Sequence, residues 1–206
     1  MTLLPASIGY AATWTGAGRQ LDFSATGVRN IPGGANGSAA ALEAARAGAN
    51  PRYAILRYAV TGLQTLPADW QMRVALDGQY TRDALVSGEQ FGVGGQNSVR
   101  GFDERELAND IGHRATLEFH TPDVGERLGP GVSARALVFA DQGWTRRNHP
   151  LPGERVSAHV SSVGVGIRVS LAPSWQLRVD AAHVTQGAGS RPRGDERLHS
   201  SIGYAY

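Results

Sequence analysis

A strict alternation of apolar and polar residues, repeated in about nine segments, is the feature that most constrains this chain. In the segment 70–80 the apolar residues occupy alternate positions: Trp70, Met72, Val74, Leu76 and Tyr80. The positions between them hold polar residues: Gln71, Arg73, Asp77 and Gln79. A period of two sends the two sets to opposite faces of an extended strand. We therefore expect an all-β protein.

The same pattern marks further segments along the chain: 8–14, 21–25, 56–60, 113–120, 135–144, 163–171, 175–181 and 198–206. A strand with one polar and one apolar face suits a membrane β-barrel, in which the apolar face meets lipid and the polar face lines a wet lumen. The pattern predicts a transmembrane antiparallel β-barrel, to which this chain contributes about nine strands.

The connections between these segments alternate in length. The short ones are 16–19, 65–69 and 172–174, with 121–132 somewhat longer; the long ones are 29–52, 81–112, 145–155 and 185–197. Short turns at one end of the strands and long loops at the other are typical of outer-membrane barrels. In the first long loop, Ser38 can cap a short helix and Gly48 can end it, and we expect that helix to be extracellular.

Aromatic residues gather near the expected strand ends. Trp14, Trp70 and Trp175 lie at the short-turn ends, and Tyr80 and Trp144 at the long-loop ends, all on the apolar face. Two such belts mark the edges of a membrane. The alternative is a soluble β-sandwich whose aromatic residues fill a core, but a sandwich gives no reason for the alternating loop lengths.

Composition narrows the class of protein. With 206 residues, 41% hydrophobic and 18% charged, the chain suits one sizeable domain and is too apolar to be disordered. All 20 basic residues are Arg, and they are scattered along the strands. The base composition of the genome explains this better than nucleic-acid binding, which would cluster them. The chain has no cysteine, and its histidines lack ligand spacing, so neither a metal nor another cofactor is expected. It has no Gly-x-Ser-x-Gly turn of a lipase, and we expect no enzyme.

The long loop between two of the strands carries the most distinctive sequence, FGVGGQNSVRGFDEREL at 91–107. Gly94, Gly95 and Gly101 let the backbone turn back on itself and approach a wall closely. The loop and its flanks (GEQFGVGGQNSVRGFDERELANDIG), the strand RALVFADQGW and the closing RLHSSIGYAY together resemble the TpsB transporters of two-partner secretion. These are the haemolysin-activator proteins of the ShlB/FhaC/HecB type, and the resemblance runs from Ser7 to Tyr206.

The resemblance implies an outer-membrane barrel of about sixteen strands, of which this chain supplies the last nine or so. It implies a translocator that exports an unfolded haemolysin- or adhesin-type exoprotein, TpsA-like, from periplasm to cell surface by two-partner (type V) secretion. The expected domain is therefore 1–206, the C-terminal portion of such a barrel, with an inward-folding loop 81–112. The start of the chain has no secretory signal, and no POTRA domain is present, so we expect a truncated chain.

The resemblance also implies a pair of site residues. The motif Val99, Arg100, Gly101 and Phe102 folds inward, and Arg100 meets Asp141 of the Phe-x-Asp-x-Gly strand, which also holds Phe139 and Gly143. The alternation independently sends Asp141 to the polar face. A two-residue pair predicts that exchanging the two charges restores some export. The alternative is that Arg100 is a solvated loop charge.

Further charges are expected to face the lumen: Arg57, Arg73, Arg114, Arg135, Arg168 and Arg178, with Asp22, Asp77, Glu118, Asp141 and Asp180. They suit a polar lining for an unfolded client or internal ion pairing, and the sequence favours neither. At the other end of the chain, Tyr204 and Tyr206 on the lipid face resemble a C-terminal signal for the barrel-assembly machinery. Two rival functions stay open: an assembly and insertion factor of the same superfamily, and a passive porin-like barrel.

Overall fold

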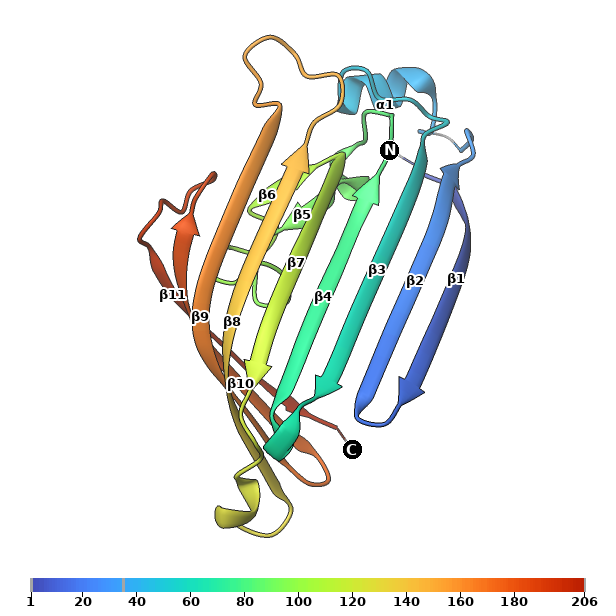
Figure 1. Ribbon diagram of the computed structural model, residues 1–206. Coiled ribbons are helices and arrows are strands. Elements are labelled where there is room, and N and C mark those ends of the chain that lie inside the picture. The colour runs from blue at the N-terminus through green and yellow to red at the C-terminus, as the bar shows by residue number, and fades with distance from the viewer. Residues whose placement is uncertain (1, 35, 206) are drawn as a thin grey trace.

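A computed structural model describes residues 2–34 and 36–205 of the chain. One antiparallel sheet of nine strands dominates it, in the order β1-β2-β3-β4-β7-β8-β9-β10-β11 (Figure 1). The strands are β1 (Pro5–Gly16), β2 (Arg19–Asn30), β3 (Ala54–Thr65), β4 (Gln71–Tyr80), β7 (Ile111–His120), β8 (Val132–Arg146), β9 (Ser157–Leu171), β10 (Trp175–Gln186) and β11 (Glu196–Tyr204). The expected strands and their antiparallel order are confirmed.

The sheet is curved, and within the described residues its edge strands β1 and β11 do not pair with each other (Figure 1). Each strand pairs with the next sheet strand along the chain, because every connection is a hairpin or a longer return. The all-β class is confirmed, with the barrel left open in this chain. In the described part, no helix is long and apolar enough to cross a membrane.

The outward face of the sheet is apolar, as the alternation predicts. Ile8, Val138, Val165 and Ile202 are each about half exposed or more, although all are large and apolar. The tryptophans at the short-turn ends, Trp14, Trp70 and Trp175, are exposed on the same face, as is Tyr80 at the other end. Trp144 differs, since it is half-buried and stacked on His113 with ring centroids 5.3 Å apart.

The long and short connections lie at opposite ends of the sheet (Figure 1). Short turns and the 3-10 segments η1 (Pro67–Asp69) and η3 (Gly125–Arg127) lie at one end, and helix α1 (Ala39–Ala45) lies at the other. Ser38 caps α1 by accepting a hydrogen bond from the backbone N–H of Ala41 at 3.2 Å.

The helix ends earlier than the sequence predicts. It stops at Ala45, before Gly48, because Arg46 adopts an extended backbone with φ −159° and ψ 126°. In this conformation the guanidinium group of Arg46 points to Asp110 and pairs with it. A tertiary contact therefore sets the helix end in place of the local glycine signal.

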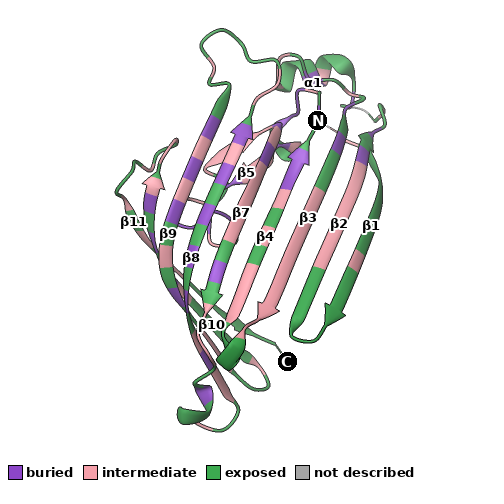
Figure 2. Cartoon of the chain, viewed as in Figure 1, coloured by how far each residue is buried: buried purple, intermediate pink, exposed green. Residues whose placement is uncertain are grey.

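The expected loop 81–112 is more ordered than its composition indicates. It contains the short strands β5 (Phe91–Val93) and β6 (Leu107–Asn109), which pair in an antiparallel hairpin, and the 3-10 segment η2 (Ser87–Glu89). The hairpin packs against the inner face of the sheet, and buried residues gather on the strands around it (Figure 2). The segment 81–110 is called the inward loop below.

Candidate functional site

A small apolar cluster holds the inward loop against the wall of the sheet. Val93, Val99 and Phe102 of the loop pack with Val160 of β9 and Val184 of β10, and all five side chains are at most 1% exposed. This contact replaces water on both surfaces, and it fixes the loop on β9 and β10. Of the expected motif, Val99 and Phe102 therefore serve packing.

The tip of the loop lies close to the wall. Gly101 has φ +94°, a region that L-residues other than glycine rarely adopt, and a Cβ there would lie 3.3 Å from Cγ2 of Val184. Its backbone N–H donates to Nε2 of His199 on β11 at 2.9 Å. The side-chain amide of Gln96 donates to the hydroxyl of Ser201, also on β11, at 3.2 Å.

Arg100 lies at the centre of a buried ionic cluster. Its Nε and Nη2 donate to the two carboxylate oxygens of Asp141 at 2.7 and 2.8 Å, and its backbone N–H donates to the same side chain at 3.1 Å. Its Nη1 donates to Glu118 of β7 at 2.8 Å and to Asp180 of β10 at 3.3 Å. Arg100 is 3% exposed, and the three carboxylates are at most 6% exposed. One loop residue therefore connects β7, β8 and β10.

The ring of Phe139 packs against the guanidinium group of Arg100. The central carbon of the guanidinium group lies 3.5 Å from the centroid of the Phe139 ring, a close cation–π contact. Room for this ring comes from β9, where a Cβ on Gly164 would lie 2.4 Å from Cζ of Phe139. Gly166 provides the same room for Asp180, whose Oδ1 would lie 2.3 Å from a Cβ at that position. The glycines alternating with valine on β9 thus leave space for the cluster.

Further arginines balance the charge of the cluster. Arg168 donates to Asp180 at 2.8 Å, and Arg73 lies 3.4 Å from Glu118. His120 contacts the same oxygen of Glu118 at 3.2 Å. Three arginines thus face three carboxylates, which is the condition for burying such charges.

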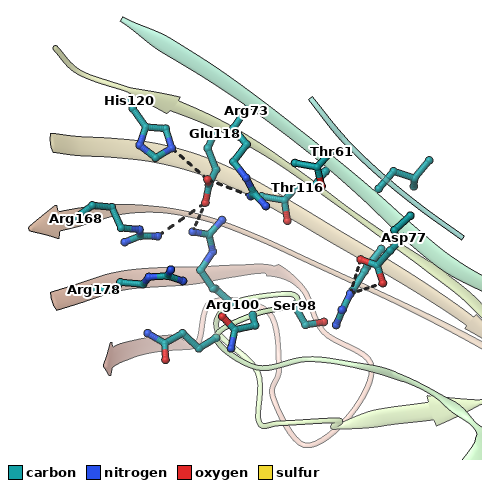
Figure 3. Close-up of a pocket in the computed structure, with 16 residues that line it drawn as sticks. Thr61, Arg73, Asp77, Ser98, Arg100, Thr116, Glu118, His120, Arg168 and Arg178 are labelled. Atoms are coloured by element: carbon teal, nitrogen blue, oxygen red, sulfur yellow. Dashed lines mark hydrogen bonds and ion pairs between the residues drawn. The ribbon is translucent and has the colours of Figure 1, made fainter. Parts of the chain in front are cut away.

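The inner face forms an open cavity of about 660 Å³ that is lined in part by this cluster. Its lining is rich in arginine: Arg73, Arg100, Arg114, Arg168 and Arg178. Arg73, Arg100 and Arg168 gather around Glu118 (Figure 3). The side chains come from strands that are neighbours in the sheet and from the tip of the inward loop. The arrangement can hold polar groups of a guest chain, and it offers them mainly donors.

Three of the inner arginines lie in register on neighbouring strands. Arg135 of β8 is directly opposite Arg168 of β9, which is opposite Arg178 of β10. Like charges so placed oppose strand pairing. Arg135 is neutralised by Asp69 of the turn, at 2.6 Å, and Arg168 by Asp180, while Arg178 has no ion-pair partner among the described residues.

Of the remaining charges expected to face the lumen, three form ion pairs and the fourth, Asp22, forms hydrogen bonds. Arg114 pairs with Asp77 at 2.8 Å, and Arg57 pairs with Glu89 of the inward loop at 2.8 Å. Asp22 accepts hydrogen bonds from Thr13 and Gln20 and has no ion-pair partner in the described part of the chain. The structure therefore contains internal ion pairing and an open polar lining side by side.

The sequence predicts the contact between Arg100 and Asp141, but it does not predict the other two carboxylates that bind Arg100. Glu118 and Asp180 were placed on the inner face by the alternation, yet nothing in the sequence joins them to Arg100. The contacts argue against the expectation that exchanging the charges of Arg100 and Asp141 restores export, because an Asp at position 100 would face Glu118 and Asp180. Gly164 and Gly166 are the feature of the sequence that could have indicated this cluster, because two glycines on the inner face of one strand leave room for large side chains of its neighbours.

Gly143 and the C-terminal tyrosines complete the expected set. Gly143 lies beneath the hairpin, where a Cβ would be 2.3 Å from Cγ1 of Val93. Tyr204 is 57% exposed on the outward face and contacts Trp175 with ring centroids 4.8 Å apart. Tyr206 lies outside the described residues.

Comparison with known proteins supports the same architecture. CdiB from Acinetobacter baumannii is similar in structure, with a TM-score of 0.70 and 22% identity, over 97% of this chain and 33% of that chain. CdiB from Escherichia coli matches with a TM-score of 0.78 and 16% identity, over 99% of this chain and 37% of that chain. This chain thus spans about a third of the length of either protein. Among curated proteins, none matches the chain.

A sequence model of one protein family covers most of the strands described above. It is the model of the haemolysin secretion/activation protein ShlB/FhaC/HecB, and it matches residues 7–169. The matched range includes the inward loop, Arg100 and Asp141. The chain belongs to the ShlB/FhaC/HecB family of haemolysin secretion/activation proteins.

Proposed function

We propose that this chain is part of an outer-membrane translocator that exports an unfolded exoprotein by two-partner secretion. The observation that carries the proposal is the inward loop, fixed at Arg100 by three buried carboxylates within a family of secretion proteins. The exoprotein is of the haemolysin or adhesin type, TpsA-like, and enters from the periplasm.

The two faces of the sheet support this assignment. The outward face is a continuous apolar surface with exposed tryptophans at one end, which suits contact with outer-membrane lipid. The inner face carries the arginine-rich cavity, which suits an extended client whose backbone carbonyls need donors. Export then depends on the inward loop holding a defined position on that face.

Arg100→Ala tests the proposal in the polypeptide that carries this chain, expressed together with its exoprotein. The substitution leaves Glu118, Asp141 and Asp180 buried without Arg100, at a cost of about 3–5 kcal/mol. We expect exoprotein in the medium to fall at least about tenfold while the barrel still reaches the outer membrane. The measurement is immunoblotting of culture supernatant and of outer-membrane fractions.

Arg193→Ala is the matched control, because Arg193 is exposed and makes no hydrogen bond or ion pair among the described residues. It should export normally. The exchanged variant, Arg100→Asp with Asp141→Arg, should stay as defective as Arg100→Ala. Normal export by Arg100→Ala would reject the proposal.

The same strains separate the two rival functions. An assembly factor would lose other outer-membrane barrels when Arg100 is replaced, with the exoprotein affected only secondarily. A passive porin-like barrel would change its conductance in planar bilayers and leave exoprotein export untouched. The translocator predicts unchanged levels of other barrels and a specific loss of export.

A further inference from the structure

A second buried ion pair lies at the root of the inward loop. Asp110 stands between β6 and β7, and its side chain is fully buried. Its partner Arg46 follows helix α1 and is 10% exposed at the side chain. The two residues come from different long connections, the first spanning 31–53 and the second being the inward loop.

The carboxylate of Asp110 joins three segments. Its Oδ2 accepts from Nη2 of Arg46 at 2.7 Å and from the backbone N–H of Asn148 at 2.7 Å. Its Oδ1 accepts from Nη1 of Arg46 and from the backbone N–H of Leu85 at 2.9 Å. Arg46 in turn donates to the backbone carbonyls of Leu85 at 2.5 Å and of Asn148 at 3.0 Å. Neither charged group therefore lacks partners.

Side-chain amides extend the same network. Asn148 donates to the carbonyls of Thr81 and Asp83, each at 3.0 Å, where the inward loop leaves β4. Gln79 of β4 donates to the carbonyls of Glu89 and Asp110, at 2.9 and 3.1 Å. Both arms of the inward loop are thus tied to the segment that carries α1 and to the connection after β8.

We infer that Arg46 and Asp110 are positioning residues for Arg100. Between Arg100 and Asp110 the chain runs through the paired strand β6, so fixing Asp110 limits how far the loop tip can move from the carboxylates of the wall. The surface segment around α1 thereby controls the position of the tip. Its effect on export rests on the proposed function, whereas the coupling itself is measurable without any client.

Spin labels measure the coupling directly, because these 206 residues contain no cysteine, and any cysteine elsewhere in the full polypeptide is replaced by serine before labelling. Asn97 is exposed at the loop tip, Ala44 is exposed on α1, and Val165 is exposed on the outward face of β9. One pair, Asn97→Cys with Val165→Cys, reports the tip. The other, Ala44→Cys with Val165→Cys, reports the surface segment. The distances between the labels are measured by pulsed electron paramagnetic resonance in the full polypeptide.

Arg46→Ala should broaden the distance distributions of both label pairs and lower export by about tenfold. Arg46→Lys keeps the charge, so it should fold normally. Because lysine cannot contact both carboxylate oxygens and both carbonyls, it should give intermediate broadening of the tip distances and intermediate export. Arg52→Ala is the matched control, since Arg52 is exposed on the same segment and its side chain has no partner among the described residues.

A purely local clamp gives a different result. If Arg46→Ala and Arg46→Lys loosen only the α1 label pair, and the tip distances and export stay at the unmutated level, the inference is overturned. Arg100→Ala keeps the two proposals distinct. Normal export by that variant rejects the translocator proposal, while the tip distances in Arg46→Ala still decide the coupling.

Discussion

At the scale of single residues, the number of partners of Arg100 governs how its site responds to substitution. A planar guanidinium group can donate to three carboxylates at once, and a lysine at this position would contact them as a single point charge. The site also depends on a residue with no charge, Phe139, whose ring lies under the guanidinium group.

Phe139→Leu should weaken the anchoring of the loop by about 1–2 kcal/mol, because leucine fills much of the space but presents no π face to the cation. The expected result is a lower temperature at which the folded barrel loses its heat-modifiable band on gels. Phe119→Leu is the control, since Phe119 is exposed on the outward face. Equal losses in both variants would assign the effect to apolar contact alone.

At the scale of elements, glycines of the sheet, Gly112 and Gly143, allow the close approach of the hairpin β5–β6. A methyl group at position 143 would meet Val93 at 2.3 Å and Val99 at 3.0 Å, and the hairpin backbone would have to move. Gly143→Ala should therefore destabilise the docked loop by about 1–3 kcal/mol and reduce export. Protease sensitivity of the inward loop in intact cells measures the first effect.

Gly203→Ala provides the comparison, because a Cβ at position 203 has nothing within 4 Å. It should leave protease resistance and export unchanged. Resistance of Gly143→Ala equal to that of Gly203→Ala would contradict the close approach described for the hairpin.

The carboxylate of Asp123 organises the turn between β7 and β8, with Asp69 accepting from the backbone N–H of Asp123. Asp123 accepts from the hydroxyl of Ser133 and from the backbone N–H groups of Ala134 and Gly125, and these hydrogen bonds lower its pKa from 3.8 to about 2. Because the folded state favours the charged form, the stabilisation is complete above about pH 4 and is lost as the pH falls towards 2.

The protection factors of residues 121–131, which are the intrinsic hydrogen-exchange rates divided by the observed ones, should therefore fall across that acidic range in the unmutated protein. Asp123→Ala should show low protection already at neutral pH and a smaller further fall on acidification, because it removes the acceptor of all three hydrogen bonds. Protection independent of pH in the unmutated protein would remove Asp123 as the cause.

The elements were predictable where local rules decide them. Alternation located the nine strands of the sheet, and Ser38 marked the start of α1. The helix end was not predictable, because Arg46 leaves the helix to reach Asp110, a residue 64 positions away in sequence. Glu118 and Asp180 show the same limit at the site, since sequence alternation gives the face of a side chain and not its partner across three strands.

At the scale of the whole molecule, β11 carries part of the apolar outward face. Leu198, Ile202 and Tyr204 are all more than half exposed on that face. We propose that the barrel-assembly machinery binds this strand by pairing with its edge, with Tyr204 and the terminal Tyr206 as the signal.

Deletion of Tyr206, or insertion of one residue before it, should then lower outer-membrane levels severalfold, because either change removes the aromatic residue from the position in the alternation that the proposed signal requires. Tyr206→Phe should keep normal levels. The measurement is the amount of folded barrel in outer-membrane fractions, with periplasmic degradation products followed in parallel. Normal levels after both the deletion and the insertion would exclude Tyr206 from the signal.

The hydrogen bonds between the loop tip and β11 have a mechanical consequence. Gly101 and Gln96 hold His199 and Ser201, while Asp110 fixes the other end of the loop at the rim. The inward loop is thus a strut that runs from the rim across the inner face to β11. A pull on the tip is shared among β7, β8, β10 and β11, so the tip comes free only when the buried contacts of Arg100 break together with the two hydrogen bonds to β11.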